Sequence, residues 1–151
     1  MYFEDMSSYC YYLKTPLSNV KNVGWLERSK AYNTGDVDGD FLPRLSNIIL
    51  GNDVIDTQVN KMRSVHPCSL SSCYLQEIKE GDRKACLGAA EIWIPSIENG
   101  EFFASPSMVY HYIEKHGYLP PKEFISAVMS FNFELPFKAQ DAYLNAVKGH
   151  F

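Results

Sequence analysis

The chain has 151 residues, of which 46% are hydrophobic and 21% are charged, and its formal net charge is −4. This balance is typical of a globular protein and predicts one domain over residues 1–151. The acidic charge and the scattered Lys and Arg exclude a general nucleic-acid binder and a membrane-surface protein, because both need clustered basic side chains. No stretch approaches the roughly 18 apolar residues of a membrane span, so the sequence favours a cytoplasmic protein.

The first half of the chain predicts one strand and one helix. Residues 8–13 are rich in aromatic side chains and favour a strand, whereas the polar residues 17–22 favour a loop. An apolar stripe with helical spacing then follows Asp38 and Asp40, either of which can cap a helix, and Gly51 suits the position just after one. The buried face of this helix is expected to consist of Phe41, Leu42, Leu45, Ile48 and Ile49.

The second half predicts a hairpin followed by helices. Residues 84–95 favour a strand, Asn99-Gly100 is a strong turn signal, and residues 101–104 form the returning strand. Three helices are expected, the first with Ser105 as its cap, Pro106 at its first position and Gly117 after its end, then residues 121–129 and 138–148. The order predicts an α+β fold, with a small antiparallel sheet, a hairpin near residues 84–104 and three C-terminal helices.

Side chains of the kinds that bind zinc occur in two groups, one in a predicted loop and one on a predicted helix. Zinc is typically held by four Cys or His ligands in a tetrahedron. The candidate ligands are Cys68, Cys73, His111, His116 and His66. His66 or Cys86 can replace one of the two His residues on the predicted helix, His111 and His116. They predict a structural zinc site. The alternative is that these Cys and His residues are packing residues without a metal.

The two helical His residues place a geometric condition on this site. His111 and His116 are five residues apart, so their directions on a regular helix differ by about 140°. Both therefore reach one metal only if the last turn tightens before Gly117.

The same region also permits a catalytic interpretation. A Cys of the loop with His66 or His111 can form a thiolate–imidazole pair. Glu91 lies within an apolar strand, where it is either a buried acid with a raised pKa or a side chain that faces solvent or pairs with Lys or Arg. Since no established catalytic motif is present, a small metal- or thiol-dependent enzyme using Cys68, His111 and Glu91 is the alternative hypothesis.

Seven short segments combine into a pattern. They are Tyr2–Asp5, Asn22–Leu26, His66–Cys68, Gly88–Ile92, Ala104–Tyr112, His116–Tyr118 and Pro120–Phe124. Together they resemble an uncharacterised family of small bacterial proteins, a domain of unknown function, and the likeness extends to about Met129. The resemblance implies a His-x-Cys-x-x-Cys arrangement, in which Ser71 stands at the second Cys position and Cys73 follows two residues later. It implies no established activity.

The function that the sequence favours is a non-catalytic, cytoplasmic protein-binding domain. The acidic charge, the ten Tyr residues and the absence of a catalytic motif motivate this hypothesis. The expected partner is another protein, such as a basic bacterial toxin, which would make the chain an immunity protein with a structural zinc site.

Overall fold

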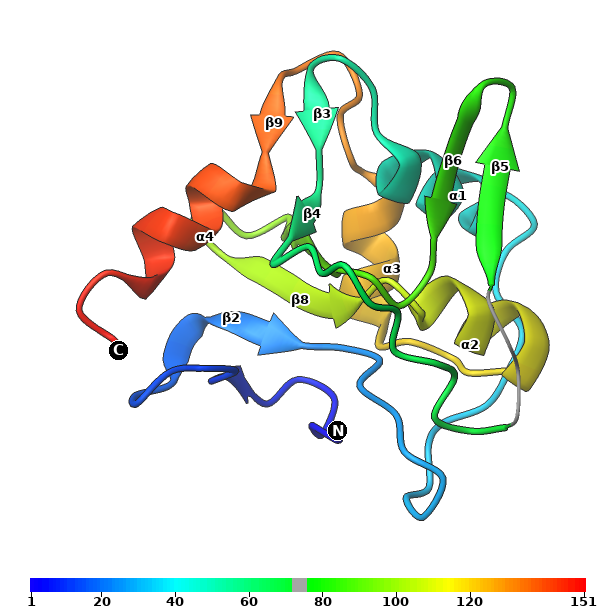
Figure 1. Cartoon of the computed structure of the whole chain (residues 1–151), viewed down its shortest axis with the longest axis horizontal. Coiled ribbons are helices and arrows are strands. Elements are labelled where there is room, and N and C mark those ends of the chain that lie inside the picture. Colours follow the sequence, from blue (N-terminus) through cyan, green and yellow to red (C-terminus); the bar gives the residue numbers. More distant parts are fainter. Residues whose placement is uncertain (72–75) are drawn as a thin grey trace.

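The structure is a computed structural model that describes residues 1–71 and 76–151. Its centre is a five-stranded sheet in the order β1-β2-β8-β7-β4 (Figure 1). These strands are β1 Ser8–Tyr9, β2 Leu17–Asn22, β4 Gln58–Val59, β7 Glu91–Pro95 and β8 Phe102–Pro106. Strands β7 and β8 are antiparallel and flank the predicted turn, so the hairpin is confirmed, as is the α+β class.

Strand β2 forms where the sequence predicts a loop, and it pairs in parallel with β8. The sheet is therefore mixed, whereas the sequence predicts an antiparallel one. Leu17 and Val20 are buried, and the side-chain amide of Asn22 donates a hydrogen bond to Ser7 Oγ at 3.1 Å. The loop prediction is wrong because β1 and β8 form backbone hydrogen bonds with the two edges of this segment. The polarity of residues 17–22 does not reveal pairing with strands that are distant in the sequence.

Two predicted strands are shorter than expected because the backbone turns. The strand predicted at residues 8–13 is confined to β1, and Tyr12 has φ +66°, which a continuing strand does not allow. Gly88, with φ +94°, divides the strand predicted at residues 84–95 in two. The remaining strands form two small sheets: β5 Glu77–Glu80 is antiparallel to β6 Arg83–Cys86, and β3 Ile55–Asp56 is parallel to β9 Phe137–Lys138.

The described residues contain the predicted helix of the first half and the three predicted C-terminal helices. They are α1 Phe41–Leu50, α2 Val109–His116, α3 Lys122–Met129 and α4 Ala139–Val147. The predicted start of α2 is wrong, because Ser105 and Pro106 continue β8 opposite β7. Pro106 is accommodated there because β2 pairs with β8 only as far as Ala104. No helix in the described ranges has the length and apolar character that a membrane crossing requires.

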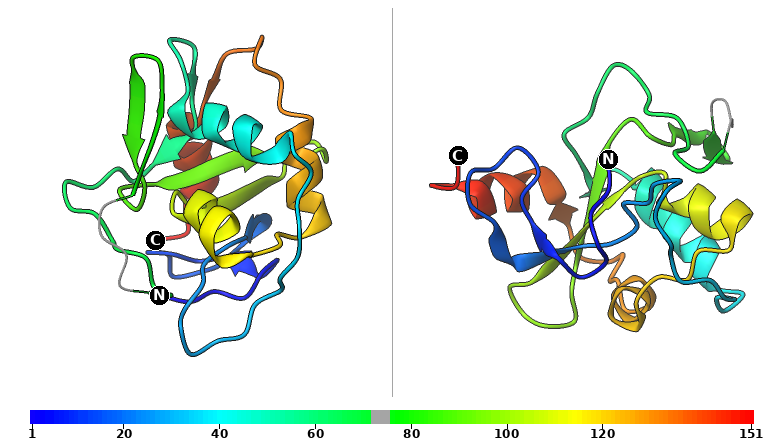
Figure 2. Two further views of the ribbon diagram at one scale, coloured as in Figure 1. Left: turned by 90° about the vertical axis from the view of Figure 1, so that its right-hand side faces the viewer. Right: turned by 90° about the horizontal axis from the view of Figure 1, so that it is seen from below.

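Hydrophobic side chains pack on both faces of the sheet. Along β7, Ile92 and Ile94 are buried in a core that α1, α2 and α3 complete, whereas Trp93 is buried in a second core with α4. This alternation is the period of two expected of a strand. The ring of Trp93 lies 5.3 Å from those of Tyr9 and Tyr143, measured between centroids. Figure 2 shows α4 lying apart from the other three helices.

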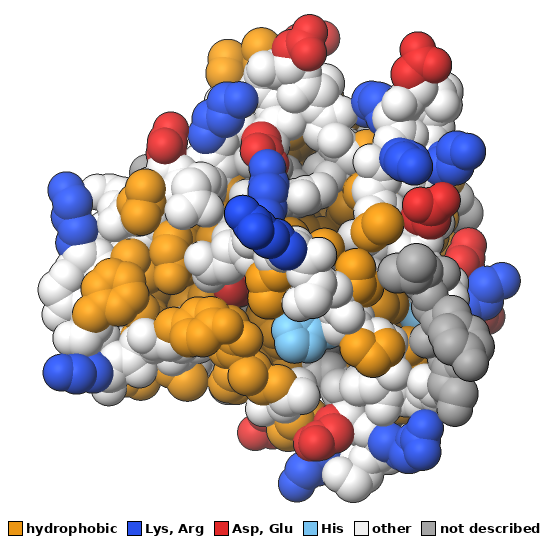
Figure 3. Space-filling view, viewed as in Figure 1, with side chains coloured by type: hydrophobic (Ala, Val, Ile, Leu, Met, Phe, Trp, Pro, Cys, Tyr) orange, Lys and Arg blue, Asp and Glu red, His pale blue; other side chains and the backbone are white. Residues whose placement is uncertain are grey.

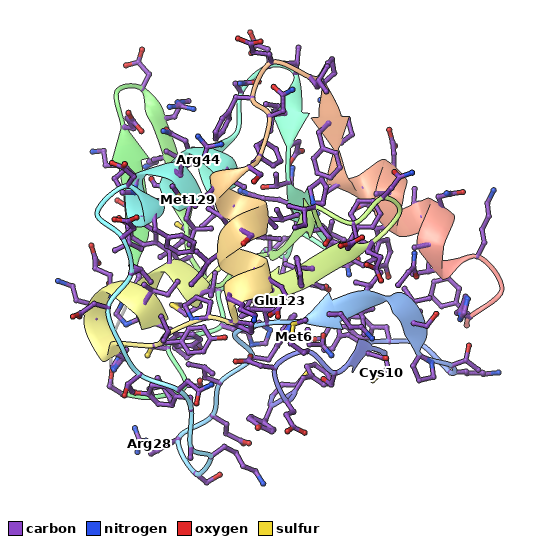
Figure 4. The ribbon with its side chains drawn as sticks, turned by 180° about the vertical axis from the view of Figure 1, so that it is seen from behind. Met6, Cys10, Arg28, Arg44, Glu123 and Met129 are labelled. Atoms are coloured by element: carbon purple, nitrogen blue, oxygen red, sulfur yellow. The ribbon has the colours of Figure 1, made fainter. Side chains whose placement is uncertain are left out.

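Arg44 joins α1 to the end of α3. Its Nε donates a hydrogen bond to the carbonyl of Val128 at 2.9 Å, and an Nη group donates to the carbonyl of Phe131. Figure 4 shows Arg44 beside Met129, the last residue of α3. Carbonyl groups at the C-terminal end of a helix lack partners within the helix and carry partial negative charge. The guanidinium group therefore holds these two helices together on the side opposite the face shown in Figure 1.

Candidate metal centre

Three of the predicted ligands meet at one point. One side-chain donor atom each of Cys68, His111 and His116 lies within 4.8 Å of the other two. The Sγ atom of Cys68 is 3.4 Å from Nε2 of His116, and the rings of His111 and His116 are 5.0 Å apart between centroids. Cys68 and His111 are buried, and His116 is partly exposed. Thiolate and imidazole are the ligands that zinc prefers, so this group can hold a metal ion.

The end of α2 explains how two His residues five positions apart come together. The last turn widens rather than tightens, because the amide of Gly117 donates to the carbonyl of Tyr112, five residues earlier. A wider turn rotates the chain by fewer degrees per residue, so the two side chains diverge less than on a regular helix. Helical side chains also lean toward the N-terminus, which directs His116 back toward His111. The sequence predicts that both His residues reach one metal only if the last turn tightens, whereas in the structure a wider turn brings them together.

The loop that carries Cys68 is anchored to two other parts of the chain. Ser69 forms a hydrogen bond through Oγ to the hydroxyl of Tyr112 on α2 at 2.8 Å, and its hydroxyl also donates to the carbonyl of Leu26. The amide of His66 donates to the carbonyl of Gly88 at 2.9 Å. A Cβ atom at Gly88 would collide with the carbonyl oxygen of His66, so glycine is needed for this close approach.

His111 is the unusual member of the group. Its side chain is only 2% exposed, yet neither ring nitrogen has a hydrogen-bond partner among the described residues. Burial lowers the pKa of His111, and the neighbouring His116 lowers it further. A buried imidazole is then held in the neutral form that binds metal ions. A buried polar atom without a partner is rare in folded proteins, which singles out His111 as a ligand candidate.

The other predicted ligands lie apart from this group or outside the described residues. Cys73 falls outside the described ranges. His66 is exposed and does not belong to the group, and Cys86 is exposed with Sγ 3.9 Å from a Glu77 oxygen. Ser71, which sequence reasoning did not consider as a ligand, has its Oγ 3.4 Å from His116 Nε2. The signal that could have found Ser71 is its place at the second Cys position of the family pattern.

A cavity of about 740 Å³ lies beside the group, and Cys68 forms part of its wall. It is bounded by the N-terminal segment, by Trp25 and by the loop of residues 60–69. Met1 and Tyr12 are 64% and 66% exposed, so they lie at its mouth. Figure 3 shows hydrophobic side chains gathered on the face of the molecule that carries the N-terminal segment and β2. The cavity is therefore large and apolar enough for a small organic molecule.

Glu91 forms the acidic part of the cavity wall. It is 4% exposed, so it does not face solvent, and among the described residues it has no ion-pair partner. Its carboxylate instead accepts hydrogen bonds from Tyr9 at 2.8 Å, from Trp93 at 3.4 Å and from the amide of Asn60. Burial raises the pKa of Glu91, although the three hydrogen bonds lower it. Of the alternatives that the sequence left open, the structure supports the buried acid.

The comparison with known families matches the part of the chain that contains this group. The sequence profile of a family described as a domain of unknown function, DUF7919, matches residues 1–129. The chain belongs to this family. The predicted membership of an uncharacterised family is confirmed. The matched range contains Cys68, His111 and His116, whereas β9 and α4 lie beyond it. No curated protein and no solved structure matches the chain.

Proposed function

We propose that this DUF7919 protein is a non-catalytic binding protein in which Cys68, His111 and His116 supply three of the four ligands of a structural zinc ion. The observation that carries the proposal is the buried His111, whose ring nitrogens lack partners among the described residues while two zinc-type ligands lie within 4.8 Å. A bound ion would occupy one nitrogen and remove part of the cost of burying it unpaired. Zinc is favoured over magnesium or calcium because the donors are sulfur and nitrogen.

The distances support a tetrahedral ion. Bond lengths of about 2.3 Å to sulfur and 2.0 Å to nitrogen place two tetrahedral ligands about 3.5 Å apart. The separation between Cys68 Sγ and His116 Nε2 is 3.4 Å, close to that value. All three donor atoms lie within 4.8 Å of one another, so one ion can be reached by the whole group.

The zinc ion would join a loop to a helix. Residues 60–69 contain no helix or strand, so their position depends on the few hydrogen bonds that anchor them. Cys68 belongs to this loop, whereas both His ligands belong to α2. Because Pro67, Cys68 and Ser69 line the cavity, the ion would also fix one of its walls. Its expected role is therefore to hold a binding surface in shape.

The partner we propose is another protein with a basic surface, met in the cytoplasm. The net charge of −4 supports this proposal, because an acidic protein is drawn to a basic partner. Immunity to a basic bacterial toxin is one function of this kind. A neighbouring gene for a secreted toxin, whose product binds the protein, would support it, and the absence of such a gene would count against it.

A second candidate function is a small metal- or thiol-dependent enzyme. The observation that favours it is that Cys68 and Glu91, two of the three residues predicted for such an enzyme, line the same cavity. The third, His111, lies beside Cys68 but is not among the lining residues. Iodoacetamide tests it, with the exposed Cys86 as an internal reference. If Cys68 in the metal-free protein reacts much faster than Cys86, the enzyme is favoured, whereas slower reaction argues for a structural thiol.

The zinc proposal is tested by measuring the metal content of untagged protein by plasma mass spectrometry. We expect about one zinc per chain in the native protein and in a Cys86→Ser control, because Cys86 is exposed and lies outside the group. The Cys68→Ser variant should lose the metal and unfold at a lower temperature, since structural zinc binding contributes folding free energy. Metal-free native protein that does not take up added zinc would refute the proposal.

A further inference from the structure

The cavity contains a buried carboxyl group, that of Glu91, without an ion-pair partner among the described residues. Glu91 is more than nine-tenths buried, and the groups that bond to its oxygens are the neutral hydroxyl, indole and amide of Tyr9, Trp93 and Asn60. No described residue forms an ion pair with it. A carboxylate has about four acceptor positions, so three donors leave one position for a further donor. Buried carboxylates are normally paired with a cation.

The cationic groups that line the cavity do not pair with Glu91: Lys61, His66 and Met1, whose amino group is a third possible cation, form no ion pair with it. Lys61 lines the cavity, but its Nζ forms an ion pair with Asp56 at 2.9 Å and is largely exposed. His66 also lines the cavity and is exposed. The facing titratable group is Tyr9, whose hydroxyl already donates to the carboxylate and whose pKa is raised by burial and by Glu91. The carboxyl group of Glu91 therefore has no cationic partner among the described residues, and a ligand could supply one.

Aromatic rings line the path from the mouth of the cavity. Tyr11, Tyr12 and Trp25 all contribute to its wall. The ring of Tyr11 stacks on that of Trp25 with centroids 5.8 Å apart, which makes one continuous aromatic surface. The faces of such rings carry partial negative charge and attract cations. They also offer a flat apolar surface to the hydrocarbon part of a ligand.

We propose that the cavity binds a small organic cation, whose ammonium group pairs with the carboxylate of Glu91 and whose apolar part lies against Tyr11, Tyr12 and Trp25. The volume of about 740 Å³ is in the range of small-molecule sites. An ammonium group would donate the fourth hydrogen bond to the carboxylate and neutralise its charge. The ligand class is thus an aryl- or alkylamine. This inference does not depend on zinc, because Glu91 and the rings lie outside the metal group.

The test compares an amine with a neutral molecule of the same shape. Benzylamine and benzyl alcohol are titrated into the native protein at neutral pH, and binding is followed by the NMR amide signals of residues around the cavity. We expect benzylamine to bind at least about tenfold more tightly than benzyl alcohol, and benzoate to bind more weakly than either. Equal affinities for the amine and the alcohol, or no binding of the amine at millimolar concentration, would overturn the proposal.

Variants then assign the preference to the cavity. Glu91→Gln keeps the shape but removes the charge, so the preference for the amine should disappear, whereas the exposed Glu98→Gln control should retain it. Tyr12→Asn removes a ring at the mouth with little risk to the fold, because Tyr12 is 66% exposed and Asn tolerates its positive φ. It should weaken benzylamine several-fold. An unchanged preference in Glu91→Gln, or unchanged affinity in Tyr12→Asn, would contradict the assignment.

Discussion

Replacing His111 with leucine should have opposite effects with and without zinc. The side chain is 2% exposed, and its two nitrogens lack partners among the described residues. Leucine has a similar volume and no polar atoms. In the presence of a chelator, His111→Leu should therefore unfold with a higher free energy than the native chain, because the variant no longer buries unpaired nitrogens.

The expected size follows from the cost of burying polar groups. Each unpaired polar atom costs about 1–3 kcal/mol, and imperfect packing of leucine offsets part of the gain, so the metal-free variant should be more stable by about 1–3 kcal/mol. With free zinc at about 1,000 times Kd, the native chain should gain about 4 kcal/mol and His111→Leu almost nothing. The order of stability should therefore invert when zinc replaces the chelator.

Urea unfolding followed by circular dichroism, with chelator or with zinc, measures both effects. The matched control is His66→Leu, which changes an exposed His on the cavity wall that lies outside the metal group. That control should gain as much from zinc as the native chain does. If His111→Leu is less stable than the native chain in chelator and is stabilised equally by zinc, the reasoning about His111 is wrong.

Four further predictions concern the surroundings of the site. Ser71→Cys should raise zinc affinity at least about tenfold in competition with a chelator, because it adds a thiolate beside the group; unchanged affinity would argue against a metal there. Gly88→Ala should lower the free energy of unfolding by more than about 1 kcal/mol in urea, because φ is +94° and the new Cβ would meet the carbonyl of His66, and a neutral effect would count against this close contact. Burial raises the pKa of Glu91, so the stabilisation that its protonated form provides is full below the unfolded pKa of about 4.3 and is lost as pH rises through the folded pKa. The stability of Glu91→Gln relative to the native chain should therefore increase between these two pKa values when urea unfolding is measured as a function of pH. A stability difference that does not change with pH would contradict this prediction. Arg44→Gln should cost about 1–3 kcal/mol by the same measurement, because it removes hydrogen bonds to the carbonyl of Val128 in the last turn of α3 and to that of Phe131 just beyond it. A loss below about 0.5 kcal/mol would show that these bonds do not matter.

Local patterns were sufficient to predict that the four helices exist, but not where α2 begins. Helix α1 follows directly from its apolar stripe, and Gly51 and Gly117 end α1 and α2 with φ +66° as expected. The start of α2 was mispredicted because Ser105-Pro106 is a good helix start by local chemistry but is held in β8 by pairing with β7. Strand β2 was missed for the same reason, since its partners are distant in sequence.

The site could be predicted by residue type but not by arrangement. Cys68, His111 and His116 were candidates, yet only the folded chain shows that the loop lies against α2 and that the last turn of the helix widens. The burial of Glu91 beside Tyr9 depends on the pairing of strands, which spacing along the chain does not reveal. The sequence therefore predicted the ligand types, and tertiary packing determined which of them meet.

The most direct test of the zinc proposal is the visible spectrum of the protein loaded with Co²⁺, which takes the place of zinc in such sites. Ligation by Cys68 and two imidazoles in a tetrahedron predicts strong visible absorption and a near-ultraviolet charge-transfer band from sulfur to cobalt. The charge-transfer band should be absent from Cys68→Ser and present in Cys86→Ser. A spectrum like that of hydrated Co²⁺ in the native protein would contradict the proposed metal centre.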